Sequence, residues 1–186
     1  VNNPDEIICD PMCGTGGVLL EGALLNQSMI GIDLDEEMVL GSKTNLEWLK
    51  KTQKNTKSQR VFHGNAVKTA ELLKNKEIKI DGLVFDPPYG KNAWKSEDTW
   101  DLFSNVLSNT RNADGIKLDS RLVCFLPISP GIQGINEPIS GEKDLGTFST
   151  QQLKSKFNET GWNIISMHAI PIHGSLARML IFAMAN

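Results

Sequence analysis

The sequence contains little of what would mark a secreted, disulfide-rich or membrane protein. Only three of its 186 residues are cysteines, which is too few, and an odd number, for a disulfide framework. The longest uninterrupted apolar stretches, residues 122–128 and 179–185, are far shorter than the roughly 20 residues of a membrane-spanning helix. No basic and then apolar leader opens the chain. We therefore expect a reducing, cytoplasmic compartment.

A biased composition is absent as well. Hydrophobic residues make up 40% of the chain and charged residues 22%, with 16 glycines and 8 prolines, which is the balance of an ordinary globular protein. At roughly 150 residues per domain, residues 1–186 predict a single domain. The chain begins at Val1 and enters a strand-like stretch within a few residues, so we expect it to be a fragment of something longer.

The basic excess of a self-sufficient nucleic-acid-binding protein is also missing, because the net charge is −3. The charge is unevenly spread: residues 1–42 hold eight acidic and no basic side chains, whereas residues 43–79 hold ten basic and three acidic ones. Residues 80–186 hold nine basic and eleven acidic side chains. The basic stretch fits a solvated helix face as well as an RNA-facing patch, so charge leaves both interpretations open.

Apolar stretches of strand length alternate with segments of helical spacing along the whole chain. Such alternation requires a mostly parallel, doubly wound α/β sheet with helices on both faces. A closing hairpin would add an antiparallel strand at or near one edge and bring the sheet to seven strands. Strands are predicted at residues 6–9, 29–32, 60–63, 81–85 and 122–126, helices at 16–26, 36–49, 66–76, around 100–107 and at 150–159, and the hairpin at 163–172 and 178–184.

A polar residue follows each of the first four predicted strands: Asp10, Asp33, Asn65 and Asp86. In an open parallel sheet, ligands bind at the carboxyl ends of the strands, near the point where the strand order reverses. A single polar residue at a strand end would be no evidence for a site. Four of them, each at the carboxyl end of its strand, predict a cleft lined by strand ends.

A glycine-rich turn follows the first of these strands. Residues 10–17 read Asp-Pro-Met-Cys-Gly-Thr-Gly-Gly and open a helix, whose first N–H groups can hold a carboxylate or a phosphate. The turn lacks the Lys-Ser/Thr pair of a P-loop, which argues against nucleoside triphosphate hydrolysis. Asp33 lies 17 residues beyond Gly16, where an acid can accept both hydroxyls of a ribose. Together they predict an adenosine-bearing ligand, either a dinucleotide or S-adenosylmethionine.

The turn after the fourth strand, Asp86-Pro87-Pro88-Tyr89, distinguishes these two ligands. Its two prolines fix φ and have no N–H, so the turn is rigid and its carbonyls are free to accept. A planar group with an exocyclic –NH2 fits this turn, because its N–H groups can donate to Asp86 and to the Pro87 carbonyl while its ring stacks on Tyr89. A plain strand-ending turn is the alternative, and the Asp10 and Asp33 pair in the same sheet makes it the weaker one.

These motifs together resemble the THUMP-associated tRNA guanine-N2 methyltransferase family, in particular the archaeal enzymes acting on guanosine-10. The resemblance rests on residues 10–17 with Glu21-Gly22-Ala23, on residues 86–90, and on the pattern His173-x-Ser175-Leu176-x-Arg178, and so covers essentially the whole chain. It implies a Rossmann-like class I S-adenosylmethionine-dependent methyltransferase. Gly64-Asn65-Ala66 departs from the Gly-Asp-Ala of the family, although Asn65 can still bond an adenine edge. The amino-terminal THUMP region, which would dock tRNA, is also missing.

The resemblance implies a role for each matching residue and no metal. The catalytic turn comprises Asp86, Pro87, Pro88 and Tyr89. The glycine-rich turn after the first strand holds the methionine part of the methyl donor. Asp33 holds its ribose, and Asn65 and Ala66 hold its adenine. The tRNA substrate meets Tyr89 and further polar residues, with Arg178 able to reach a phosphate. The full cofactor set is Asp10, Pro11, Cys13, Gly14, Thr15, Gly16, Asp33, Leu34, Asn65, Ala66 and Asp86, and the substrate set is Tyr89, Lys91, Asn92, His173 and Arg178.

Four other functions stay open on the residues alone. The same turn serves adenine-N6 and glutamine-amide methylation, although amide methylation usually goes with Asn in place of Asp86. A non-enzymatic relative that only binds cofactor or RNA would have no need of an intact catalytic turn. A dinucleotide oxidoreductase comes last, because nothing marks a hydride site. Cys9 and Cys13 lack a nearby third and fourth ligand, so zinc is not expected.

Overall fold

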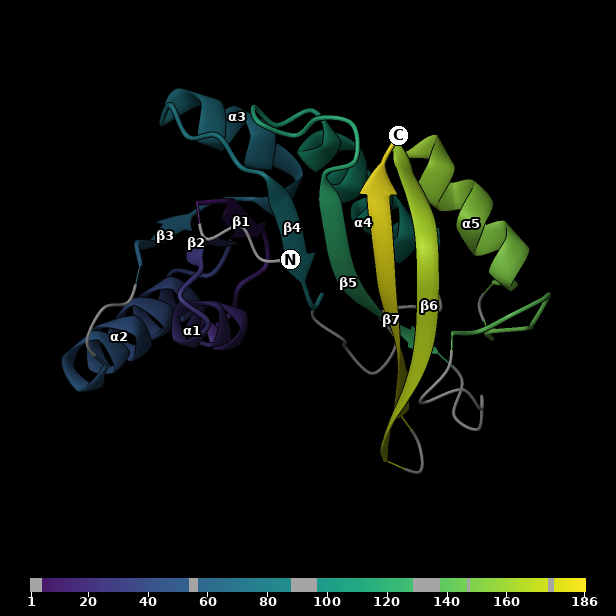
Figure 1. The fold of residues 1–186 in the computed structure, drawn as a ribbon, viewed down its shortest axis with the longest axis horizontal. Coiled ribbons are helices and arrows are strands. Elements are labelled where there is room, and N and C mark those ends of the chain that lie inside the picture. Colours follow the sequence, from purple (N-terminus) through teal and green to yellow (C-terminus); the bar gives the residue numbers. More distant parts are fainter. Residues whose placement is uncertain (1–4, 54–56, 88–96, 129–137, 147, 174–175) are drawn as a thin grey trace.

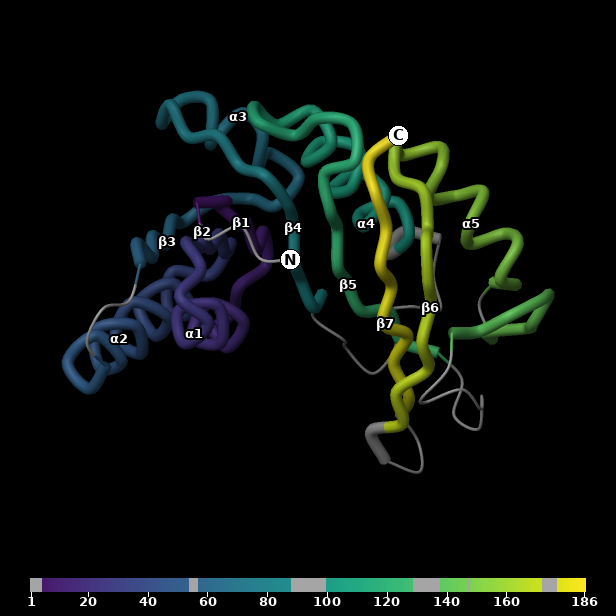
Figure 2. The backbone as a smooth tube through the Cα atoms, viewed as in Figure 1, coloured from purple at the N-terminus to yellow at the C-terminus, as the bar shows by residue number. Residues whose placement is uncertain are grey.

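The computed structural model describes residues 5–53, 57–87, 97–128, 138–146, 148–173 and 176–186. Within these ranges, seven strands form one sheet, and helices pack against it (Figures 1 and 2). The elements are β1 (Ile7–Asp10), α1 (Gly17–Leu24), β2 (Ser28–Asp33), α2 (Glu36–Thr52), β3 (Gln59–His63), the 3-10 turn η1 (Ala66–Lys68), α3 (Thr69–Asn75), β4 (Gly82–Phe85), α4 (Glu97–Arg111), β5 (Arg121–Ile128), α5 (Thr150–Glu159), β6 (Trp162–His173) and β7 (Leu176–Ala185).

The strand order is β3-β2-β1-β4-β5-β7-β6, and it confirms the predicted doubly wound sheet with a closing hairpin. The chain builds outward from β1 through β2 to β3, then returns to place β4 on the other side of β1. All pairings from β3 to β5 are parallel, while β7 is antiparallel to both β5 and β6. The order therefore reverses between β1 and β4, where an open sheet of this kind binds its ligands.

Two hydrophobic clusters show how the helices cover the sheet. Leu19 of α1 and Val39 of α2 share one cluster with Met29 and Val61 of the sheet. The larger cluster lies on the opposite face and includes Phe103 of α4. The first half of the sheet is therefore covered on both faces, as alternating strands and helices require.

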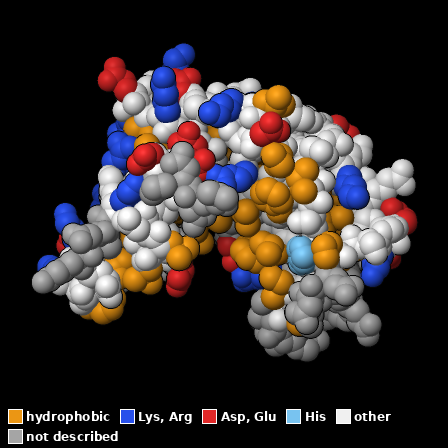
Figure 3. Space-filling model, in the orientation of Figure 1, with side chains coloured by type: hydrophobic (Ala, Val, Ile, Leu, Met, Phe, Trp, Pro, Cys, Tyr) orange, Lys and Arg blue, Asp and Glu red, His pale blue; other side chains and the backbone are white. Residues whose placement is uncertain are grey.

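The covering differs in the second half of the sheet. Along β7, Met179, Ile181 and Ala183 are buried in the larger cluster, whereas the alternate residues Leu180 and Phe182 are only half-buried. In the view of Figure 3, hydrophobic side chains gather over β5, β7 and β6, the half of the sheet away from α1 and α2. The prediction of helices on both faces therefore does not hold for the half of the sheet formed by β5, β7 and β6. There α4 and α5 lie on one face, and no described helix lies on the other.

Local signals set several helix boundaries. Asp35 caps α2 as predicted, with its Oδ1 accepting from Glu37 N at 2.8 Å. Ser149 and Gln152 form a capping box at the start of α5. The single helix predicted over residues 66–76 is wrong, because the segment is divided into η1 and α3. No helix in the described part of the chain has the length and apolar character to cross a membrane.

Trp162 anchors β6 to α4 and provides a test of the core. Its side chain is fully buried, and its Nε1–H donates to the Leu107 carbonyl at 3.0 Å. We expect Trp162→Phe to lower the free energy of unfolding by about 1–3 kcal/mol, because it removes the buried indole hydrogen bond and leaves a gap where the larger ring was packed. Trp48→Phe is the matched control, since Trp48 is 64% exposed, and should change the value by less than about 0.5 kcal/mol. Urea unfolding of both variants measures the difference, and equal values would contradict the assigned role.

Candidate functional site

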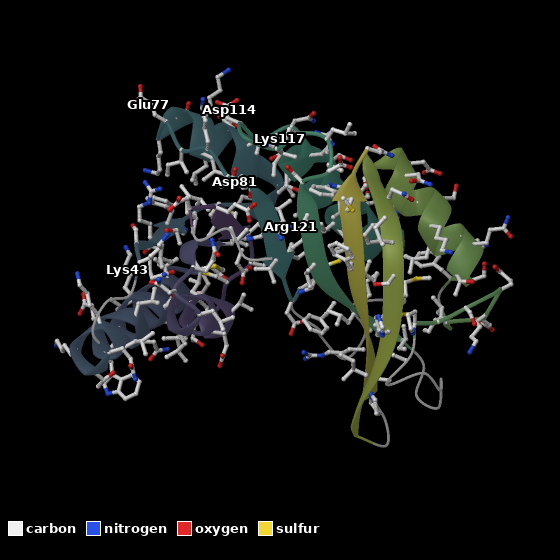
Figure 4. The ribbon with its side chains drawn as sticks, in the orientation of Figure 1. Lys43, Glu77, Asp81, Asp114, Lys117 and Arg121 are labelled. Atoms are coloured by element: carbon white, nitrogen blue, oxygen red, sulfur yellow. The ribbon has the colours of Figure 1, made fainter. Side chains whose placement is uncertain are left out.

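A cavity of about 640 Å³ opens at the carboxyl ends of β1, β2 and β4. Its volume lies within the range of roughly 300–1,000 Å³ that is usual for small-molecule and cofactor sites. Asp81 and Arg121, labelled in Figure 4, precede or begin β4 and β5 and mark the opposite, amino-terminal edge of the sheet. The cavity is lined by Asp10, Pro11, Met12, Cys13, Gly14, Thr15, Gly17, Val18, Asp33, Leu34, Asp35, Met38, Asn65, Ala66, Asp86 and Leu102.

Strand register explains why residues so distant in sequence share this cavity. Asp10 is paired with Gly31, two residues before Asp33. Cys9 is paired with Leu83 on the other side, three residues before Asp86. Because neighbouring strands lie about 4.8 Å apart, the three carboxylates converge on one edge of the sheet. The predicted cleft lined by strand ends is therefore present, and Asp10, Asp33, Asn65 and Asp86 all line it.

Two glycines of the turn, Gly14 and Gly16, have different roles. Gly14 has φ +53° and lines the cavity, and a side chain there would meet nothing within 4 Å. Gly16 has φ +86°, and an added Cβ would lie 2.4 Å from Ser42 Oγ on α2. Both conformations favour glycine, but only Gly14 faces the ligand space. Gly16, which the sequence assigned to the cofactor, lies outside the cavity wall and lets the turn pack on α2.

Asp33 accepts two backbone hydrogen bonds that sequence reasoning missed, one from the glycine turn and one from the residue that caps α2. Its Oδ2 accepts from Gly14 N at 2.8 Å, and its Oδ1 accepts from Asp35 N at 2.9 Å. One carboxylate therefore joins the turn after β1 to the start of α2. Each carboxylate oxygen has a further lone pair, so the group can also accept from a ligand hydroxyl.

Asp10 is a buried carboxyl beside the other two. It is 1% exposed, and its Oδ1 accepts from Met12 N at 3.0 Å. Burial, with a smaller contribution from the Asp33 and Asp86 charges, raises the pKa of Asp10 to about 7, against the lowering effect of the Met12 hydrogen bond. Asp10 therefore exchanges its proton near neutrality.

The cysteines near the site are ordinary thiols. Burial, followed by the charges of Asp10 and Asp33, raises the pKa of Cys13 to about 12, so it is not a thiolate nucleophile at pH 7. Cys9 is fully buried in the core. Within the described ranges, no cluster of three or more His, Cys, Asp or Glu residues could hold a metal ion.

Asp86 takes part in an ion pair that the sequence did not predict. Its Oδ2 lies 2.5 Å from Nη1 of Arg178, which comes from β7. The other oxygen, Oδ1, is buried and has no hydrogen-bond partner among the described residues. A buried acceptor without a partner costs free energy, and such groups mark places where a donor is expected to bind.

The remaining predicted residues fall into two groups. Asn65 caps η1 through Oδ1, which accepts from Val67 N at 3.0 Å, and Ala66 next to it is buried in the cavity wall. Pro88, Tyr89, Lys91 and Asn92 lie outside the described residues, as does the side chain of His173. Their roles stay predictions.

Three apolar side chains at the cavity mouth complete the lining. Leu34 was predicted from the sequence, whereas Met38 and Leu102 were not. Leu34 is 67% exposed, Leu102 49% and Met38 36%, although large apolar side chains usually avoid water. The position of Met38 in the first turn of α2, just after Asp33, was a usable signal. Leu102 had none, because α4 reaches the cavity only through tertiary packing.

The comparisons with known proteins agree with this geometry. Residues 2–125 match the family model described as RMKL-like, methyltransferase domain. The chain belongs to this methyltransferase family. The methyltransferase domain is also similar to solved structures at 14–16% identity, which shows the fold alone. A Methanosarcina mazei S-adenosylmethionine-dependent methyltransferase has a TM-score of 0.68, with 99% of this chain and 94% of that one covered. The Synechocystis magnesium protoporphyrin IX methyltransferase, with S-adenosylhomocysteine bound, has a TM-score of 0.63, with 100% and 76% covered.

Two curated relatives of the methyltransferase domain are named for the same activity. A probable tRNA (guanine(10)-N2)-dimethyltransferase of Methanothermococcus thermolithotrophicus is 34% identical over 119 residues, which are 63% of this chain and 68% of that protein. The tRNA (guanine(10)-N2)-dimethyltransferase of Pyrococcus abyssi is 33% identical over 141 residues, 76% of this chain but only 39% of that enzyme. The methyltransferase domain thus spans a minor part of the longer relatives.

The raised pKa of Asp10 makes the stability of the methyltransferase domain depend on pH in a specific direction. The unfolded chain binds this proton only below its ordinary pKa of 3.8, whereas the folded chain holds it up to about 7. This contribution is fully present below pH 3.8 and is lost as the pH rises to 7, by an amount on the order of 4 kcal/mol. Asp10→Asn removes it. We expect wild type to lose stability relative to Asp10→Asn between pH 4.5 and pH 7.5 in urea unfolding, and parallel curves would contradict the assignment.

Proposed function

We propose that this chain transfers a methyl group from S-adenosylmethionine to the exocyclic N2 of a guanosine in tRNA, at position 10 as in the relatives' names. The observation that carries the proposal is Asp86, a residue of the cavity wall whose Oδ1 has no hydrogen-bond partner among the described residues, in a chain of the methyltransferase family. An amino group is the donor that this oxygen lacks. The curated relatives are named as methyltransferases of guanine N2, and this supports guanine as the base that carries the amino group.

The cavity residues fit the methyl donor. Asp10, a carboxyl of the cavity wall, would hold the ammonium of its methionine part, and the backbone of Gly14 would allow close approach. Asp33 would accept from the ribose hydroxyls with the lone pairs left by its two backbone bonds. Leu34, Met38 and Leu102 would surround the adenine ring with apolar side chains, and the Asn65 amide would bond its edge.

The chemistry asks little of the protein beyond positioning. When bound, S-adenosylmethionine supplies an electrophilic methyl group on a sulfonium, whose sulfur departs as a neutral thioether. Guanine N2 is a poor nucleophile because its lone pair is delocalised into the ring. By accepting its N–H groups, Asp86 Oδ1 and the Pro87 carbonyl favour the pyramidal amine and stabilise the positive charge that develops on it. The methylated nitrogen then gives up one proton to Asp86 or to water, which restores neutrality.

The target base must leave its helix, or be unstacked already, to reach a cavity at a sheet edge. Tyr89, Lys91, Asn92 and His173 are proposed to contact the flipped nucleotide. Docking of the tRNA body is proposed to reside in a THUMP-type region outside this chain, since the chain has a net charge of −3. A cytoplasmic location is part of the same proposal.

Product identification tests the substrate. Because tRNA docking is proposed to lie outside this chain, the test uses the chain together with the proposed THUMP-type docking region. We expect this protein, incubated with labelled S-adenosylmethionine and an unmodified tRNA transcript, to yield N2-methylated guanosine. A transcript with adenosine in place of guanosine-10 should accept none. N6-methyladenosine as the product would contradict the proposal, and label spread over other guanosines would overturn the assignment to position 10.

Asp86→Asn tests the catalytic assignment. The substituted amide offers an N–H where the mechanism needs an acceptor and weakens the stabilisation of the developing charge. We expect kcat to fall by roughly 10²–10³-fold, as when one stabilising group of a transition state is removed. The dissociation constant of S-adenosylhomocysteine, measured by calorimetry, should change little.

Asp101→Asn is the matched control for this test, because Asp101 is an exposed carboxylate on α4 away from the cavity lining. It should leave both values unchanged. If Asp86→Asn lost cofactor binding while the fold persisted, the role of Asp86 in transfer would be wrong.

A further inference from the structure

We infer that Arg178 is a positioning residue for the transfer step: its guanidinium holds Oδ2 of Asp86 so that Oδ1 faces the amine to be methylated. The inference rests on the proposed function. It differs from the sequence-based expectation, in which Arg178 reaches a phosphate of the substrate. The decisive contact is the 2.5 Å pair between Arg178 Nη1 and Asp86 Oδ2, which joins residues 92 positions apart.

The topology explains how β7 reaches the end of β4. Arg178 is paired with Pro127 on β5, and Phe85, the last residue of β4, is paired with Cys124 on the same strand. The ion pair therefore passes across β5. This geometry exists only because the antiparallel β7 is inserted between β5 and β6.

Side-chain alternation places the two partners on the same face of the sheet. The neighbours Ala177 and Met179 are buried, with Met179 in the larger core cluster, so Arg178 points to the opposite face. Phe85 lies in the same large cluster, which puts Asp86 on the opposite face as well. The side chains of Arg178 and Asp86 remain 27% and 31% exposed, so the pair is partly shielded from water.

Asp86 requires an external constraint because its carboxylate turns about a soft, roughly two-fold torsion. The bond to Arg178 occupies Oδ2, and this leaves Oδ1 as the one oxygen without a partner among the described residues. Asp33 lies at the same edge and repels the Asp86 charge, and Asp10 adds to this repulsion once it has lost its proton. The guanidinium offsets this repulsion and keeps Asp86 from turning away. A charge-assisted bond of this length is also among the stronger ones in proteins.

The positioning role and the phosphate role predict different kinetics. If Arg178 acts through Asp86, Arg178→Ala should lower kcat by roughly 10–100-fold, the usual cost of losing a residue that orients an active group. The KM for tRNA should then stay within a factor of about two. If Arg178 instead binds a phosphate, KM should rise with kcat unchanged, and the salt dependence of binding should weaken. The second pattern would overturn the inference.

Two further measurements use the chemistry of the lost group. Arg178→Lys keeps a cation near Oδ2 and should recover part of the lost kcat. Guanidinium chloride, added at concentrations below those that unfold the chain, should raise kcat of Arg178→Ala but not of wild type. A variant that responds to neither would contradict a role for the guanidinium.

Arg121→Ala is the matched control. Arg121 lies on β5 and forms a half-buried ion pair with Glu6, at the opposite edge of the sheet from the cavity (Figure 4). It should lose stability as Arg178→Ala does, while kcat stays at the wild-type value. An equal loss of kcat in both variants would mean that Arg178 acts only on stability.

A double-mutant cycle provides a readout that does not depend on activity. Urea unfolding of wild type, Arg178→Ala, Asp86→Asn and the double variant should show non-additive free energies, because the two side chains share one interaction. S-adenosylhomocysteine should bind Arg178→Ala within about two-fold of wild type. Additive free energies, or a crystal structure of Arg178→Ala with the carboxylate unmoved, would overturn the inference.

If wild type made no N2-methylguanosine, the proposed function would fail, while the cycle and the crystal structure would still decide the role of Arg178.

Discussion

Parallel pairing of β1 with both β2 and β4 is the constraint on which the site depends. It places the ends of three strands side by side, so that Asp10, Asp33 and Asp86 meet at one edge although 76 positions separate the first from the last. A shift of the register by one residue would turn these side chains to the other face of the sheet. Hydrophobic packing on both sides of β1 opposes such a shift, because it would move Cys9 out of the larger cluster and turn the Asp10 carboxyl towards that cluster.

Gathering three carboxylates at one edge has an electrostatic cost, and the protein meets it in three ways. Asp33 takes two backbone N–H groups, Asp86 takes the guanidinium of Arg178, and Asp10 keeps its proton up to about pH 7. In each case the aspartate keeps oxygen lone pairs that can accept hydrogen bonds from a ligand in the cavity. A methyl donor with an ammonium, a ribose and a sulfonium fits that arrangement, since all three are groups that carboxylates hold well.

Motif position could be read from the sequence because strand ends in an α/β protein are marked locally. Asp10 ends β1 and Asp33 ends β2, while Asp86 and Pro87 directly follow β4, so each polar residue lies at the strand end where it was predicted. Proline follows the aspartate at the first and third of these strand ends. The short apolar strands and the Asp35 cap follow the same logic. By contrast, η1 and α3 replaced one predicted helix, because the spacing of apolar residues does not distinguish a 3-10 turn from the start of an α-helix.

By itself, the sequence determined the fold class, the family and the strand ends that line the cavity, because these depend on patterns within a few residues of each other. Tertiary structure alone decided that Gly16 packs on Ser42 instead of facing the cavity and that Leu102 joins the wall. It also decided that Arg178 meets Asp86. These contacts join segments that are far apart in the sequence. Whether such segments meet depends on the order of the strands and the packing of the helices, and neither can be predicted from a pattern of neighbouring residues.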